Sequence, residues 1–104
     1  MLIVAGTFHV DPERRDEFIR GREASMVTSR GESGCIEYVF AADPIVPGKV
    51  VLYERWEDKD SLRAHIAAMT AAREKAGPPA DPGVPVLSSE ILQYEISAVG
   101  KLGS

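Results

Sequence analysis

Four stretches of the chain have the apolar, β-branched pattern of strands. Each is short and is bounded by glycine, proline or acidic residues, which is typical of strands in a sheet. The predicted strands are residues 2–10, 35–42 and 49–57 and a segment within 86–99. Residues 43–48 contain two prolines and a glycine, so they are expected to form a turn that joins the second and third strands in a hairpin. Four prolines and two glycines in residues 76–85 predict a stiff loop.

Two helices are predicted between the strands. The Asp-Pro-Glu sequence at residues 11–13 combines an N-cap carboxylate, a proline at the first helical position and an acidic first turn. A helix is therefore expected to begin there and to continue to about Arg30, because glycines follow it. The second helix is expected to begin at a cap, Asp58 or Asp60, and to continue to about Lys75.

The order of these elements, β-α-β-β-α-β, predicts an α+β ferredoxin-like fold with an antiparallel sheet. In this arrangement the two helices cover one face of the sheet. A length of 104 residues is a common size for one domain, so residues 1–99 are expected to form a single domain and residues 100–104 a C-terminal tail.

Both faces of the predicted sheet carry apolar residues. In the second strand, alternation places Ile36, Tyr38 and Phe40 opposite Cys35, Val39 and Ala41. In the third strand it places Val51 and Tyr53 opposite Val50, Leu52 and Trp56. A sheet face that meets water is usually polar at alternate positions, and a large apolar patch is rarely left exposed. The face without helices is therefore expected to contact a second copy of the chain in a homodimer.

Composition excludes several classes of function. The chain has 12 Lys and Arg against 16 Asp and Glu, a net charge of −4, which disfavours nucleic-acid binding and attachment to anionic membranes. No apolar run approaches the roughly 20 residues that cross a bilayer, and a cytoplasmic protein is expected. The single cysteine, Cys35, cannot form an internal disulfide and is expected to be a buried, inert thiol. With only two histidines besides, no metal site is expected.

One charged residue falls on the apolar face of the first predicted helix. At 100° per residue, Phe18 and Met26 share an apolar stripe, and Arg22 lies in the middle of it. A guanidinium in that place must pair with a carboxylate, such as that of Glu54, or line a pocket.

A histidine lies at the edge of the apolar stripe of the second helix. His65 adjoins Leu62, Ile66 and Met69 in that stripe. It either packs as a half-exposed side chain or accepts a proton in a cavity between helix and sheet, because histidine titrates near neutrality. Trp56 is an aromatic candidate for the same cavity, although core packing is the usual role of an aromatic side chain on a strand.

Three motifs together resemble the antibiotic biosynthesis monooxygenase family. They are Gly34-Cys35 followed by Tyr38, the Tyr-Glu-Arg-Trp-Glu-Asp run at residues 53–58, and the Ser-Leu-Arg-Ala-His run at residues 61–65. Their order and spacing are similar to the family's, and the order of elements extends the resemblance over about residues 1–99. The resemblance implies a dimeric α+β barrel with a pocket between the sheet and the helices.

The resemblance also implies a cofactor-independent monooxygenase that uses O2 to oxidise a phenolic or quinol-type aromatic molecule to a quinone. Such a substrate, once deprotonated, can itself pass an electron to oxygen. Under this hypothesis His65 is the base and Arg22 stabilises the developing anion. The aromatic ring of the substrate would contact Trp56, Met26, Phe18 and Met69.

Departures from the family patterns leave alternatives open. Actinorhodin-type members carry an Asn and a Tyr where this chain has Leu52 and Leu62. Haem-degrading members of a related group carry Asn, Trp and His where this chain has Thr7, His65 and Lys75, which disfavours haem oxygenation. The alternative from another class is a non-catalytic dimeric barrel that binds a small aromatic ligand, because one fold can host both functions.

Overall fold

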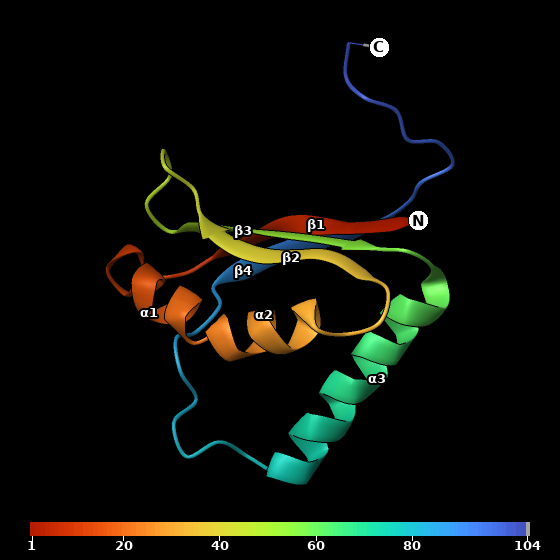
Figure 1. The fold of residues 1–104 in the computed structure, drawn as a ribbon. Helices are drawn as coiled ribbons and strands as arrows, with labels where there is room; N and C mark the ends of the chain where they lie inside the picture. The colour runs from red at the N-terminus through yellow and green to blue at the C-terminus, as the bar shows by residue number, and fades with distance from the viewer. Residues whose placement is uncertain (104) are drawn as a thin grey trace.

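A computed structural model of the chain describes residues 1–103 and has the predicted order of strands and helices. The elements are β1 (Leu2–His9), the 3-10 turn η1 (Pro12–Arg14), α1 (Arg15–Arg20), α2 (Glu23–Arg30), β2 (Cys35–Ala42), β3 (Lys49–Trp56), α3 (Lys59–Ala76) and β4 (Ser88–Glu95). All strand pairs are antiparallel, in the order β2-β3-β1-β4, and the helices lie on one side of the sheet (Figure 1). The α+β ferredoxin-like prediction is confirmed.

Both predicted helix starts carry a capping carboxylate. Asp11 Oδ1 accepts a hydrogen bond from the Glu13 backbone N–H at 2.9 Å, and Asp58 Oδ1 accepts one from the Ser61 N–H at 2.8 Å. These bonds satisfy N–H groups that have no partner within the helix. Asp58, rather than Asp60, is therefore the cap of α3.

The prediction of one continuous helix to Arg30 is wrong. The Arg22 N–H donates to the Ile19 carbonyl, three residues earlier, at 2.9 Å, and the helix begins again at Glu23. Gly21, which ends α1, has a low helix propensity, and this weakens the segment at that point. Arg22 consequently lies at a joint between two short helices and not on the face of one long helix.

The first residues of β2 depart from the predicted alternation. Cys35 pairs with Trp56, but the next pair is Glu37 with Arg55, so a β-bulge adds one residue to β2. Cys35 therefore packs toward the helices and Ile36 is exposed, which reverses the two predicted faces at this point. The Cys35 thiol is half-buried, and burial raises its pKa, which keeps it protonated and weakly reactive.

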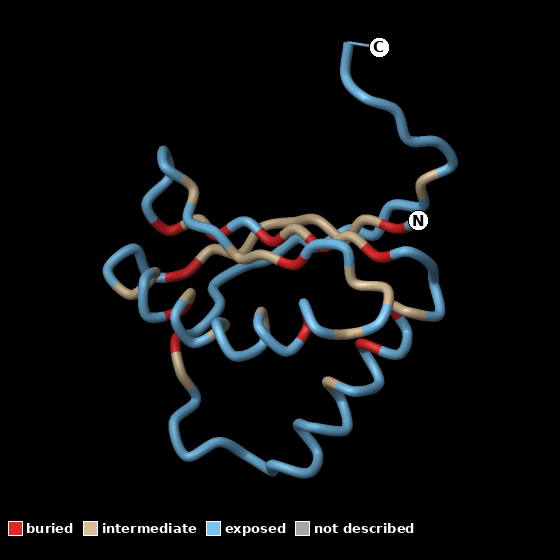
Figure 2. The backbone as a smooth tube through the Cα atoms, viewed as in Figure 1, coloured by how far each residue is buried: buried red, intermediate tan, exposed pale blue. Residues whose placement is uncertain are grey.

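The core lies between the sheet and the helices and has two clusters. One cluster consists of Val10, Phe18, Val50 and Val84, and the other of Tyr38, Trp56 and Leu62. Phe40 packs against both clusters and so joins them. Figure 2 shows that the buried positions gather where the sheet meets the helices, whereas the loop after α3 is mostly exposed.

The face of the sheet without helices is apolar and open to solvent. A shallow hollow of about 280 Å³ on this face is lined mainly by β1, β3 and β4. Among its residues, Val51 is 36% exposed, Leu92 47% and Tyr94 46%. The described helices include none that is long and apolar enough to cross a membrane.

β4 is an edge strand whose position depends on a glycine in its neighbour. All eight residues of β4 are exposed, and the strand pairs only with β1. A Cβ atom added to Gly6 of β1 would overlap the carbonyl oxygen of Glu90 and would lie 2.7 Å from the Cα of Ile91. Only glycine allows the two backbones to approach this closely.

We expect Gly6→Ala to displace β4 and to lower the free energy of unfolding by about 1–3 kcal/mol, the usual cost of overpacking. Urea denaturation measures this change. Gly100→Ala is the control, because a Cβ atom there meets no atom within 4 Å. Equal stabilities of the two variants would contradict the proposed close approach.

Candidate active site

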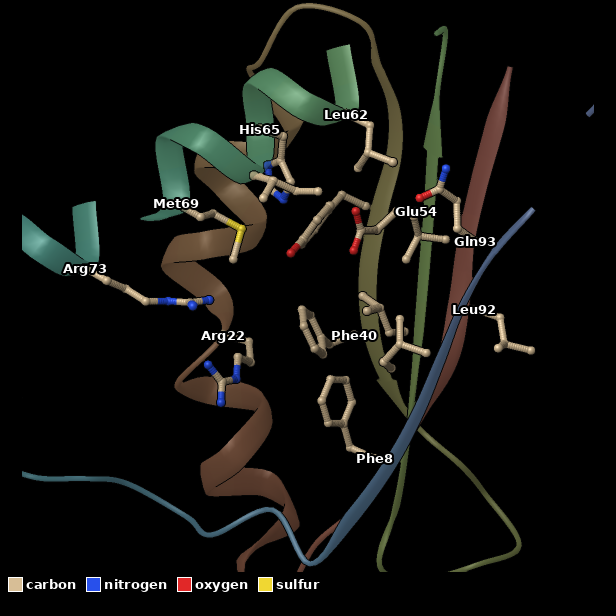
Figure 3. Close-up of a pocket in the computed structure, with 15 residues that line it drawn as sticks. Phe8, Arg22, Phe40, Glu54, Leu62, His65, Met69, Arg73, Leu92 and Gln93 are labelled. Carbon is tan, nitrogen blue, oxygen red and sulfur yellow. The ribbon is translucent and has the colours of Figure 1, made fainter. Parts of the chain in front are cut away.

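A cavity of about 490 Å³ lies between the sheet and the helices, open at one side (Figure 3). Its floor is apolar and is formed by Val4, Phe8, Phe40 and Leu52. Five further apolar residues line it, namely Leu62, Ile66, Met69, Ile91 and Leu92. Six polar residues complete the lining: Arg22, Tyr38, Glu54, His65, Arg73 and Gln93. An apolar slot with a few polar groups is the usual form of a site for a small molecule.

A buried histidine on the cavity wall is paired with a half-buried carboxylate. His65 is 3% exposed, and its Nδ1 lies 2.6 Å from Oε1 of Glu32. The half-exposed packing that the sequence allowed for His65 is therefore wrong. Because a carboxylate accepts hydrogen bonds, this contact assigns the proton of a neutral imidazole to Nδ1 and leaves Nε2 as the acceptor.

Glu32 reaches His65 because the chain turns tightly after α2. The Glu32 N–H donates to the Ser29 carbonyl at 3.0 Å, and the Cys35 N–H donates to the Glu32 carbonyl at 3.2 Å. Gly34 has a φ of 81°, in the region that favours glycine, and a Cβ atom there would overlap the Ser61 hydroxyl. The turn thus packs directly against the start of α3, the helix that carries His65.

Trp56 supports the His65 ring from behind. Trp56 is 0% exposed, and its ring centroid lies 4.7 Å from that of His65. Tyr38 contacts the same imidazole, with ring centroids 5.4 Å apart. Trp56 is not among the residues that line the cavity, so it belongs to the core beneath the site and not to the wall that the sequence suggested.

Glu54 places a second carboxylate in the cavity. Its Oε1 accepts a hydrogen bond from Trp56 Nε1 at 2.9 Å, and burial raises its pKa above the ordinary value. The negative charge of Glu32 raises this pKa further, whereas the bond from Trp56 and the proximity of His65 oppose the shift. Within residues 1–103, Arg22 and Glu54 form no ion pair, in contrast to the pairing that the sequence suggested.

Arg22 lines the cavity from the joint between α1 and α2. Its guanidinium carbon lies 4.6 Å from the centroid of the Phe18 ring, which is a cation–π contact. Phe18 itself is buried in the core, and the Met26 sulfur accepts a hydrogen bond from the Phe40 N–H at 3.4 Å. Neither Phe18 nor Met26 lines the cavity, whereas Met69 of α3 does.

The structure therefore divides the six predicted site residues into two layers. Arg22, His65 and Met69 reach the cavity, and Phe18, Met26 and Trp56 pack beneath them. Four further titratable residues at the site were not predicted from the sequence as site residues: Glu32, Tyr38, Glu54 and Arg73. Tyr38 has its pKa raised to about 12, mainly by burial and next by the charge of Glu54, so its phenol remains protonated.

The strand pattern does contain a signal for one of these residues, Glu54. Glu54 lies between Leu52 and Trp56 in strict alternation, so a carboxylate occupies a position whose neighbours on the same face are apolar. Glu32 had no such signal, because only the turn brings it to α3. Across residues 1–103, no group of three or more His, Cys, Asp or Glu side chains is placed so that it could hold a metal ion.

Comparison with known sequences identifies a family model and two relatives. Residues 1–74 match the model described as antibiotic biosynthesis monooxygenase. An uncharacterized protein of Synechocystis is 33% identical over 64 residues, 62% of this chain but 44% of that protein, so the match spans less than half of its length. YcnE, a candidate monooxygenase of Bacillus subtilis, is 26% identical over 65 residues, 62% of this chain and 68% of YcnE.

Solved structures share the fold over nearly the whole chain. One is a protein of Deinococcus radiodurans assigned to the same family, with a TM-score of 0.72 and 23% identity over 99% of this chain and 100% of that chain. Another is MhuD, a haem degrader of Mycobacterium tuberculosis with two haems bound in its active site. It has a TM-score of 0.71 and 13% identity over 97% of this chain and 100% of its own. Identities this low show a common fold and not common chemistry.

The raised pKa of Glu54 predicts a pH-dependent stability. The Glu54 carboxyl binds its proton more tightly in the folded protein than in the unfolded chain. The protonated carboxyl therefore contributes to stability at low pH, and this contribution is lost as the pH rises from the ordinary pKa of 4.5 through the raised pKa. Glu54→Gln removes the charge and keeps an oxygen that can accept from Trp56. We expect the variant to gain stability relative to the wild type as the pH rises to neutrality.

Urea denaturation over a series of pH values tests this expectation. Glu90→Gln on the exposed strand β4 is the matched control, since it makes the same change at a site open to water. If both variants follow the wild type with the same pH dependence, the raised pKa of Glu54 is refuted.

Proposed function

We propose that this chain, which belongs to the antibiotic biosynthesis monooxygenase family, uses O2 to oxidise a phenolic or quinol-type aromatic molecule to a quinone and needs no bound cofactor. The observation that carries the proposal is the pairing of Glu32 with the buried His65 at the wall of an apolar cavity. Such a cavity accepts an aromatic ring, and the pair offers a base beside it.

The first step is removal of the phenolic proton by His65. Its Nε2 makes no hydrogen bond with residues 1–103, and Glu32 stabilises the imidazolium that forms when Nε2 takes up the proton. The chain of Glu32, His65 and substrate hydroxyl thus resembles the orienting carboxylate and base of other enzymes. Glu32 acts through His65, so it is a positioning residue.

The phenolate is electron-rich enough to pass one electron to O2. Recombination of the substrate radical with superoxide and a proton gives a hydroperoxide on the ring. Its O–O bond then breaks with loss of water, so that one oxygen atom remains as the new carbonyl and the other leaves as H2O. Atoms and electrons balance for an anthrone-type phenol, which loses two hydrogens and gains one oxygen. A hydroquinone already carries the second oxygen, so it loses two hydrogens to give the quinone and O2 leaves as H2O2. Arg22, at the cavity wall, stabilises the negative charge that develops on the ring oxygen.

We expect the metal-stripped protein to consume O2 with naphthohydroquinone or anthrone as substrate. His65→Ala should lower the rate by about 100-fold or more, the usual contribution of a general base. Glu32→Gln should shift the pH profile of the rate, because it changes the partner that holds the proton on Nδ1. An oxygen electrode measures the rates, and circular dichroism checks the fold of each variant.

His9→Ala is the control, because His9 ends β1 and does not line the cavity. A rate in His65→Ala equal to that of His9→Ala would remove His65 from the mechanism. Inhibition by a chelator would refute cofactor-free chemistry. If no phenol in the panel is oxidised but aromatic ligands bind, the alternative of a non-catalytic binding barrel is favoured.

We also propose that two copies of the chain form a homodimer through the faces without helices. The apolar hollow on that face supports the proposal, since Val51, Leu92 and Tyr94 would otherwise remain exposed to water.

Sedimentation equilibrium at micromolar concentration should give twice the chain mass of 11.3 kDa for the wild type. Val51→Lys places a charge in the proposed interface and should yield the single-chain mass. Val27→Lys, at a 73% exposed position on α2, is the control and should remain dimeric. A wild type that sediments as a single chain would exclude this assembly.

A further inference from the structure

A second hollow adjoins the main cavity. It has a volume of about 330 Å³ and lies between α2 and α3. Three residues line both spaces: Arg22, Met69 and Arg73. The two hollows are therefore compartments of one site that meet at these side chains.

The two compartments differ in chemistry. The main cavity has an aromatic and aliphatic floor, whereas the second is lined by small residues of α2 and α3 and by the hydroxyl-bearing residues Ser25, Thr28 and Ser29. Glu32 also lines the second compartment, where its carboxylate is held by His65. A molecule that fills both would have an apolar ring at one end and a polar arm at the other. The hydroxyl groups can donate hydrogen bonds to such an arm.

The junction between the compartments carries two guanidinium groups, those of Arg22 and Arg73, without an ion-pair partner among residues 1–103. Figure 3 shows both guanidinium groups extending into the space between α3 and the segment that carries Arg22. The cavity carboxylates have other partners, because Glu32 contacts His65 and Glu54 accepts from Trp56. The chain as a whole is acidic, at −4, which makes two free cations at one junction more notable.

We infer that the substrate is an aromatic acid whose carboxylate, on a short arm, is bound at the Arg22–Arg73 junction while its ring lies in the main cavity. This inference rests on the proposed function, which it extends by naming the class of substrate. A guanidinium donates parallel N–H bonds that match the two oxygens of a carboxylate. Arg73 approaches from α3 and is the main partner, and Arg22 contributes charge from the joint that also faces the reacting ring.

Binding of naphthylacetate and of naphthylacetamide, measured by calorimetry without any turnover, tests the inference. The two probes have the same ring and arm and differ in charge. The wild type should bind the acid about tenfold more tightly than the amide, as expected for a charged hydrogen bond. The preference should weaken as salt is added, because the junction is open to solvent.

Arg73→Gln should remove most of the preference for the acid, Arg22→Gln should reduce it by a smaller amount, and the double variant should abolish it. Arg63→Gln is the matched control: it makes the same change in charge on the same helix, but Arg63 pairs with Asp60 and lines neither compartment. Equal binding of acid and amide by the wild type, or an acid preference in Arg73→Gln as large as that of Arg63→Gln, would overturn the inference.

The two proposals fail separately. One outcome is oxygen uptake with uncharged naphthohydroquinone together with equal binding of naphthylacetate and naphthylacetamide. It would refute the aromatic-acid inference and support the oxygenase proposal. A preference for the acid that depends on Arg73, in a protein that consumes no oxygen, would support the carboxylate site and refute the oxygenase.

Discussion

The polar side of the cavity depends on the hydrogen bond between His65 and Glu32. An imidazole that is almost wholly buried requires a partner, because an unsatisfied polar group in the core is costly. Glu32 supplies that partner from the turn after α2. This turn lies so close to α3 that only a glycine fits at position 34. The bond also assigns the roles of the two ring nitrogens. One contact therefore links the turn after α2, the start of α3 and the chemistry of the site.

Beneath the polar groups lies a packed aromatic layer that holds them in place. Trp56 supports both the imidazole of His65 and, through its N–H group, the carboxylate of Glu54. Phe18 lies under the guanidinium of Arg22 in the same way. Aromatic rings fill space and also orient their neighbours, because indole N–H groups and ring faces interact with charged side chains. The layer thus contributes to function without touching the cavity.

A site residue could be predicted from the sequence when nearby residues in the chain determine its position. It could not be predicted when its position depends on residues far away in the chain. His65 and Met69 were found because the periodicity of one helix suffices to place them near the sheet. Arg22 also reaches the cavity, but from the joint between α1 and α2 and not from the unbroken helix that the periodicity assumed. Glu32 could not be found, because its contact joins residues 33 apart in the chain. The sequence also did not predict the joint at Gly21–Arg22 or the bulge after Cys35, because periodicity assumes an unbroken helix and a regular strand. Both irregularities change which face a side chain occupies.

The amino-acid pattern alone determined the order of elements, the antiparallel α+β fold and the cap at Asp11, because these depend on local propensity and on short-range hydrogen bonds. It narrowed the cap of α3 to Asp58 or Asp60, and the structure selects Asp58. The amino-acid pattern also showed that both faces of the sheet are apolar. The tertiary structure decided which polar groups meet, namely His65 with Glu32 and Glu54 with Trp56, and which aromatic residues lie beneath the site. It alone revealed two compartments joined at Arg22 and Arg73. Such groupings arise from the packing of distant segments, which no local pattern encodes.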